Sequence, residues 1–157
     1  MPDREPPLPA HPQTSPLVIP ADLLAEMIAH CRGEAPLEAC GLLTGTGRRA
    51  STFEPIRNAL VSPNRYQSDQ RDMIRAVVGM RARGEEIVAI VHSHPKSRPI
   101  PSRTDLEWNY YGDTPQVIIS LRGEPSEVRV WQFHGPSYAS LAWIIMSPAV
   151  ESDTASD

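Results

Sequence analysis

The chain has 157 residues, a net charge of −4 and two cysteines. This length allows one domain with its own core, and the acidic balance disfavours a nucleic-acid binder that relies on a broad basic surface. Two cysteines provide no disulfide framework, and no apolar run approaches the roughly 20 residues that a membrane span needs. The N-terminus lacks the apolar core of a signal peptide, so we expect a cytoplasmic protein with no nucleic-acid or membrane partner.

Two tails are expected to flank a single domain. Residues 1–16 are rich in proline with little apolar content, and residues 148–157 are small and polar. Such segments cannot bury enough apolar surface to order themselves. We therefore expect disorder in the first segment, flexibility in the last, and one domain over residues 17–147.

The first half of the domain is predicted to contain three strands and a helix. Leu17–Ile19 is a short strand candidate, and residues 20–32 carry apolar side chains at helical spacing, including Cys31. Ala39–Thr44 and Ser51–Ile56 are predicted strands around a glycine-containing turn.

The second half is predicted to continue as a mixed arrangement. A helix is expected over Asp69–Arg83 with Ser68 as its N-cap, and Ile87–Val91 is an aliphatic run typical of a strand covered on both faces. The remaining elements are a short helix over residues 102–111 and strands over residues 116–121 and 128–134. Residues 137–146 are compatible with strand or helix. This order predicts an α/β fold with a mixed central sheet flanked by helices.

The aliphatic run ends in the stretch HSHPKSRPIPSRTD. Alternate residues of a strand point to the same face, so His92 and His94 project side by side while Ser93 points away. Two converging imidazoles can hold zinc at about 2.0–2.1 Å per bond. Asp105, placed three residues after a helix-capping Ser102, could supply a third ligand and leave one tetrahedral position open for water, as in catalytic zinc sites.

Each half of this pattern has a simpler interpretation. A His-x-His pair can occur by chance, and a Ser-x-x-Asp sequence is most often only a helix cap. The joint pattern requires four specified residues at fixed offsets, at a strand end and a helix start, and therefore favours a metal site.

The stretch HSHPKSRPIPSRTD resembles the signature of the JAMM, or MPN+, metallopeptidases. That family also carries an upstream glutamate in a segment of the type E-x-C-G-x-L-x-G, and residues 38–45 read EACGLLTG. Residues 56–73, with their Asn and Tyr-x-x-Asp, are similar to the family's connecting segment. The resemblance spans residues 17–134 and implies the three-layer MPN, or cytidine-deaminase-like, architecture.

The resemblance implies a role for each matching residue. His92, His94 and Asp105 would bind one catalytic Zn²⁺ with a bound water. Glu38 would be the general base and acid, and Ser102 would donate to the oxyanion of the tetrahedral intermediate. Without the resemblance, Glu38 would be interpreted as a solvated residue at a strand start.

Four further residues have open roles. Cys40 shares a strand face with Glu38 and could approach the metal as a redox-sensitive ligand, although a small core residue is the simpler interpretation. Trp108 is expected to pack in the core. Tyr110 and Tyr111 could pack there or line a substrate groove.

The family cleaves peptide or isopeptide bonds after the C-terminal Gly-Gly of ubiquitin-like proteins. Residues 106–115 are too short for an insertion with a second zinc site and carry no Cys/His cluster, so the chain resembles the minimal prokaryotic type. The resemblance therefore implies a ubiquitin-like sulfur-carrier protein, or its conjugates, as partner. A non-catalytic MPN-type interaction module and a zinc hydrolase of small amides are the alternatives. The cognate carrier and the oligomeric state stay open.

Overall fold

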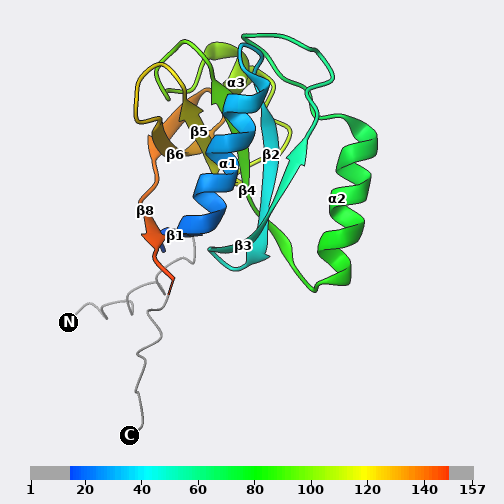
Figure 1. Cartoon of the computed structure of the whole chain (residues 1–157). Coiled ribbons are helices and arrows are strands. Elements are labelled where there is room, and N and C mark those ends of the chain that lie inside the picture. The colour runs from blue at the N-terminus through cyan, green and yellow to red at the C-terminus, as the bar shows by residue number, and fades with distance from the viewer. Residues whose placement is uncertain (1–14, 149–157) are drawn as a thin grey trace, which may run out of the picture.

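A mixed sheet of eight strands, in the order β7-β6-β5-β4-β2-β3-β1-β8, forms the centre of the molecule (Figure 1). The computed structural model describes residues 15–148, so the tails expected at residues 1–16 and 148–157 lie almost wholly outside the described range. The strands are β1 (Leu17–Pro20), β2 (Cys40–Thr46), β3 (Arg49–Ile56), β4 (Glu86–His94), β5 (Gln116–Ser120), β6 (Glu127–His134), β7 (Ser137–Ser140) and β8 (Trp143–Met146), and the helices are α1 (Ala21–Glu34), α2 (Gln70–Ala82) and α3 (Arg103–Glu107). The expected mixed α/β fold is confirmed.

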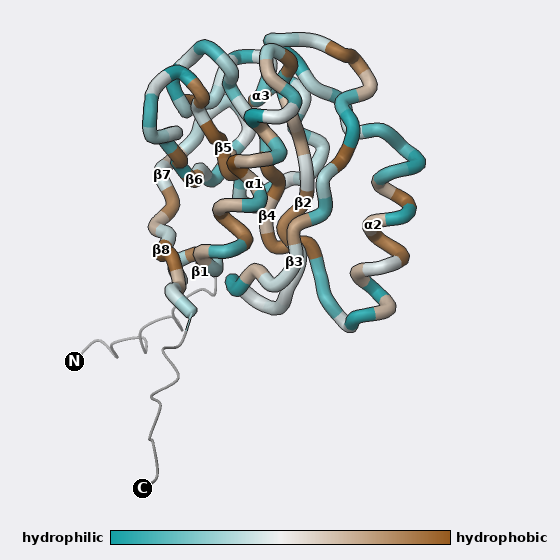
Figure 2. The backbone as a smooth tube through the Cα atoms, in the orientation of Figure 1, coloured by the Kyte–Doolittle hydropathy of each residue, from teal (hydrophilic) through white to brown (hydrophobic). Residues whose placement is uncertain are grey.

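The two long helices cover opposite faces of the sheet. Because neighbouring strand residues point to opposite faces, Leu43 packs in one hydrophobic cluster with Met27 of α1, whereas Leu42 and Ile90 pack in another with Ala76 of α2. In Figure 2 the hydrophobic colour runs along the central strands β4 and β5. The result is a three-layer arrangement in which β4 lies in the middle layer, buried between the two helices.

Helix α2 begins one residue later than the sequence predicts. Its N-cap is Asp69, whose carboxylate accepts a hydrogen bond from the Asp72 backbone N–H at 3.0 Å, so the assignment of Ser68 as the cap was wrong. Either side chain can cap a helix, and sequence alone does not choose between neighbouring candidates.

The helix expected over residues 102–111 spans only Arg103–Glu107. It ends because the side chain of Asn109 stabilises a turn: its amide nitrogen donates to the Gly112 carbonyl at 2.8 Å, and its oxygen accepts from the Tyr111 N–H at 3.1 Å. An asparagine that bonds nearby backbone groups competes with helix formation.

Residues 137–146, for which strand and helix were both open, form two short strands. Strand β7 pairs with β6 and strand β8 pairs with β1, so the two strands occupy opposite edges of the sheet. Within the described part of the chain, no helix is long and apolar enough to cross a membrane.

Strand β4 extends three residues beyond the aliphatic run and carries both histidines inside the sheet. His92 is opposite Cys40 of β2 and Ile118 of β5 in the strand register. Between the histidines, Ser93 points to the α1 face, where its hydroxyl accepts a hydrogen bond from the Ala39 N–H at 2.8 Å. The imidazoles are therefore fixed by a strand that is paired on both sides.

Candidate active site

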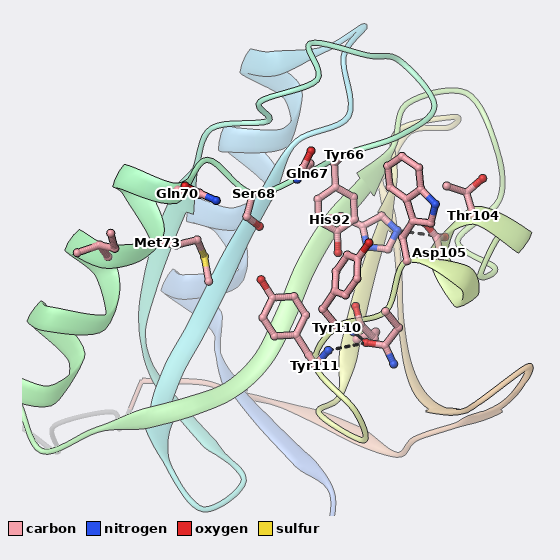
Figure 3. A pocket seen from close by; sticks show the side chains of 14 residues that line it. Tyr66, Gln67, Ser68, Gln70, Met73, His92, Thr104, Asp105, Tyr110 and Tyr111 are labelled. Atoms are coloured by element: carbon pink, nitrogen blue, oxygen red, sulfur yellow. Dashed lines mark hydrogen bonds and ion pairs between the residues drawn. The ribbon is translucent and has the colours of Figure 1, made fainter.

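Three predicted ligands converge at the end of β4. The Nε2 atoms of His92 and His94 are 3.3 Å apart, and Oδ2 of Asp105 lies 3.3 Å from the first and 3.0 Å from the second. Figure 3 shows His92 beside Asp105. Ligand atoms bound to a tetrahedral ion at about 2.0–2.1 Å are separated by about 3.3 Å. The triangle that these atoms form therefore has the dimensions of one face of a zinc coordination sphere.

Neighbouring groups orient both imidazoles. His94 Nδ1 lies 2.8 Å from the Arg98 carbonyl, which can only accept, so this nitrogen carries hydrogen and Nε2 faces the cluster. The ring of His92 stacks on that of Tyr66, with centroids 4.8 Å apart and planes inclined by 27°. Both rings are thus held with Nε2 toward Asp105.

Asp105 is both a helix-capping residue and a member of the cluster. The Ser102 hydroxyl accepts from the Asp105 N–H at 3.0 Å, and Oδ2 of Asp105 accepts from the Ser102 N–H at 2.9 Å, which completes a capping box. The cap fixes the carboxylate that faces the histidines. The two interpretations of the Ser-x-x-Asp sequence are therefore compatible.

The pKa values in the cluster show that it attracts positive charge. Burial alone would raise the pKa of Asp105, but the two imidazoles and the Ser102 N–H lower it well below its usual range. Burial alone would lower the pKa of His94, but its hydrogen bonds to Asp105 and to the Arg98 carbonyl raise it. A cation is thus favoured between these side chains.

Glu38 lies just before β2 and is only 4% exposed. Its backbone N–H donates to the Ser62 carbonyl at 2.8 Å, while its Oε2 has no hydrogen-bond partner among the described residues. Burial raises the pKa of Glu38 to about 7, an effect that His92 opposes and Asp105 reinforces. A carboxyl group that titrates near neutrality beside the cluster is suited to move protons.

Asn58 anchors the segment that holds Glu38, although its place in the sequence indicated no role for it. Its amide nitrogen donates to the Glu38 carbonyl at 3.1 Å and to the Arg65 carbonyl at 2.9 Å. Its amide oxygen accepts from the N–H groups of Leu60 and Gln67 at 3.0 and 3.1 Å. One side chain therefore fixes the backbone of Glu38 and the loop before α2.

A cavity of about 530 Å³ opens over His92 and Asp105. One wall comes from α2 and the loop before it, through Tyr66, Gln67, Ser68, Gln70, Met73 and Ile74. The other wall comes from α3 and the segment after it, through Thr104, Trp108, Asn109, Tyr110 and Tyr111 (Figure 3). Glu38 and Ser102 are not among the side chains that line it.

Trp108 is not a core residue, contrary to the expectation. Its side chain is 36% exposed and lines the cavity, because α3 ends at Glu107. Tyr110 and Tyr111 line the same cavity, and Tyr110 is 80% exposed. The three aromatic residues therefore face the groove.

Cys40 lies opposite His92 in the sheet but is separate from the ligand cluster. Among the described residues, the set of ligand atoms within 4.8 Å of one another comes from His92, His94 and Asp105. The thiol of Cys40 donates to the Ile56 carbonyl at 3.3 Å, and burial raises its pKa to about 12. A protonated, buried thiol is a poor ligand and a poor nucleophile, which favours the interpretation as a core residue.

Residues 20–134 match the family described as prokaryotic homologs of the JAB domain. The chain belongs to this family. The match confirms the resemblance to JAMM proteins on which the sequence interpretation depended.

Curated relatives of this JAB-domain protein are peptidases. The CysO-cysteine peptidase of Mycobacterium tuberculosis is 38% identical over 108 residues, which cover 68% of this chain and 74% of the relative. The probable TtuB-protein conjugate cleaving protease of Thermus thermophilus is 36% identical over 111 residues, covering 68% and 72%. The desampylase of Pyrococcus furiosus is 33% identical over 127 residues, covering 74% and 90%. The JAB-domain protein is accordingly a peptidase.

Solved structures share its architecture. The solution structure of protein DSY2949 from Desulfitobacterium hafniense aligns with a TM-score of 0.77 at 27% identity, covering 83% of this chain and 93% of that one. The JAB1/MPN domain protein AF2198 from Archaeoglobus fulgidus aligns with a TM-score of 0.52 at 17% identity, covering 83% and 98%. The three-layer arrangement is thus the JAB1/MPN fold.

Proposed function

We propose that this peptidase uses one zinc ion, held by His92, His94 and Asp105, to hydrolyse the bond after the C-terminal Gly-Gly of a ubiquitin-like carrier protein. The observation that carries the proposal is the triangle of ligand atoms, with sides of 3.0–3.3 Å, next to the buried Glu38, whose Oε2 has no hydrogen-bond partner among the described residues. We take residues 17–147 as the catalytic unit and the cytoplasm as its location.

The chain's own residues supply the proton transfers. Zinc at this site would lower the pKa of a coordinated water from roughly 15.7 to about 7. Glu38 takes the proton of the attacking water and passes it to the leaving amine, because its pKa of about 7 allows both steps at neutral pH. The Ser102 hydroxyl accepts from Asp105, so its own hydrogen is free to donate to the oxygen that becomes negative.

The shape of the site and the names of the relatives support the substrate class. A groove walled by two segments can hold an extended chain end with its final carbonyl at the metal. One relative is named as a CysO-cysteine peptidase, and another is named as a probable protease that cleaves TtuB-protein conjugates. A ubiquitin-like sulfur-carrier protein, extended by a residue or joined to another protein, combines both features.

Mass spectrometry of carriers with Gly-Gly tails, before and after incubation, tests the proposal directly. Zinc-loaded protein should shorten or release the carrier at the bond after Gly-Gly, and EDTA should abolish cleavage until zinc is restored. Zinc-loaded protein that leaves a panel of such carriers intact would contradict the proposed substrate. Cleavage that continues unchanged in EDTA, in protein shown to be free of metal, would contradict the metal requirement.

A further inference from the structure

A contact between Arg65 and Trp108 joins the loop before α2 to the segment after α3. The guanidinium of Arg65, in the loop before α2, lies over the indole of Trp108 at 5.6 Å from the ring centroid. This is a cation–π distance. Arg65 is exposed and forms no ion pair with any carboxylate in residues 15–148, so Trp108 is its main side-chain partner there.

Both partners of this contact have fixed backbones. The Trp108 N–H donates to the Thr104 carbonyl at 2.9 Å, which attaches it to the helix that carries Asp105. The Arg65 carbonyl accepts from Asn58 at 2.9 Å. The backbones on both sides of the contact are therefore fixed, and the contact with Arg65 restricts the indole.

Two aromatic side chains flank the position next to the metal ligands. Tyr66 stacks on His92, and Trp108 lines the cavity together with His92 and Asp105. Both rings line the cavity, so a chain end that lies there with its final carbonyl at the ligand cluster would have its last residues near them.

We propose that Trp108, held by Arg65, limits the side-chain size of the last two tail residues and thereby selects Gly-Gly. The inference rests on the proposed function and assigns its specificity to named residues. An indole that moves aside for a methyl group must give up its contact with Arg65, and closely packed sites respond to a single methylene. Glycine fits because it has no side chain, and its backbone can approach the rings closely.

The test compares carriers that end in Gly-Gly, Ala-Gly or Gly-Ala before a one-residue leaving group. For the zinc-loaded parent we expect kcat/KM to be about 10–200-fold higher on Gly-Gly than on the alanine tails, the range that one methylene produces. In Trp108→Ala this ratio should fall about tenfold or more, through faster cleavage of the alanine tails. Arg65→Ala should lower it by a smaller factor, and Arg81→Ala, an exposed arginine in the last turn of α2, should leave it unchanged.

A binding measurement separates this inference from the proposed function. Fluorescence anisotropy of labelled tail peptides with Glu38→Gln protein should show tighter binding of Gly-Gly than of Ala-Gly, and Glu38→Gln/Trp108→Ala should lose the difference. If the tails bind with this preference but the parent does not cleave them, the proposed reaction is contradicted. The proposed role of Trp108 is then still supported.

An unchanged Gly-Gly preference in folded, zinc-bound Trp108→Ala would overturn the inference while cleavage stands. The absence of any preference in the parent would overturn it as well. If Trp108→Ala loses its zinc, the Arg65→Ala variant provides the test. An unchanged ratio of kcat/KM between the Gly-Gly and alanine tails in Arg65→Ala would then contradict the inference.

Discussion

Two buried carboxylates face the same pair of imidazoles from different segments, and their environments differ. Oδ2 of Asp105 lies within 3.3 Å of Nε2 of both histidines and accepts a hydrogen bond from the Ser102 N–H, and the pKa of Asp105 falls. Oε2 of Glu38 has no hydrogen-bond partner among the described residues, and burial raises the pKa of Glu38 to about 7. Both side chains are nearly inaccessible to solvent, so a difference in burial does not explain why their pKa values differ. The pKa values differ because neighbouring groups compensate the charge of Asp105 more fully than that of Glu38.

This difference indicates which carboxylate does which task. A group that stays ionised in a tight cluster is suited to bind a cation, whereas a group that titrates near neutrality is suited to accept and release a proton. The proposed assignment of Asp105 as ligand and Glu38 as base therefore rests on environment, because the chemical groups are the same.

Removal of the Asp105 carboxylate should have the largest effect. Asp105→Ala deletes one of the three proposed ligands and leaves two buried imidazoles facing each other, so we expect zinc content to fall close to zero and hydrolysis to disappear. Elemental analysis after dialysis measures the metal. Asp113→Ala, on the exposed segment before β5, is the matched control and should retain one zinc. Full zinc content in Asp105→Ala would contradict the ligand assignment.

Glu38→Gln should separate metal binding from catalysis. The amide has the shape of the carboxylate but cannot accept the proton, so kcat should fall by about 10²–10⁴-fold, the range for general acid–base groups. Zinc content should stay at one ion per chain. Single-turnover cleavage of a Gly-Gly carrier provides the rate, and retention of most of the parent's rate would show that another group is the base.

The pKa of Glu38 also predicts how pH affects stability when zinc is absent. The folded value of about 7 is above the ordinary 4.5, so folding favours the protonated form. The contribution of Glu38 to stability is fully present below pH about 4.5 and is lost as pH rises through about 7.

Relative to Glu38→Gln, metal-free parent protein should therefore lose on the order of 3 kcal/mol in unfolding free energy between pH 4.5 and pH 8, because each pKa unit corresponds to about 1.4 kcal/mol. Urea denaturation of both proteins in EDTA measures the difference between their unfolding free energies. The contributions of the other titrating groups cancel in this difference. A difference that stays constant with pH would show that folding does not raise the pKa of Glu38.

Asn58→Asp should have a smaller effect through the position of Glu38. The carboxylate cannot donate to the Glu38 and Arg65 carbonyls, so the loop should loosen and kcat should fall by about tenfold, the equivalent of one lost hydrogen bond. KM and zinc content should change little. Asn64→Asp in the same loop is the control, since the carboxylate can still accept from the Ser62 hydroxyl. Equal effects of the two changes would argue against a specific positioning role.

Cys40→Ser should have the smallest effect on the site. The buried thiol, with a pKa of about 12, is protonated at neutral pH and donates to the Ile56 carbonyl, which a serine hydroxyl can also do. We expect unchanged zinc content and unchanged sensitivity to peroxide. Loss of peroxide sensitivity in this variant would instead support a redox role for Cys40.

The sequence predicts the cluster because its members follow local rules. The period of two in a strand places His92 and His94 together, and the capping position of Ser102 fixes where Asp105 points. The pattern forms a site only if the end of β4 and the start of α3 lie close together in the fold. Local spacing does not encode that distance.

Other features were not predicted, one because a side chain competes locally with the helix and the others because they depend on long-range contacts. The early end of α3 is produced by the side-chain bonds of Asn109, and it moves Trp108 from the expected core to the groove. The role of Asn58 depends on reaching Glu38, which is 20 residues away. Strand β8 forms only because β1 offers an edge.

Diffraction at the zinc absorption edge, on crystals of zinc-loaded protein, tests the central assignment most directly. We predict one anomalous peak about 2.0–2.1 Å from Nε2 of His92, Nε2 of His94 and Oδ2 of Asp105, with the Glu38 carboxyl on the same side of the sheet. A peak bound by other side chains, or zinc-loaded crystals without a peak at these three atoms, would contradict the account.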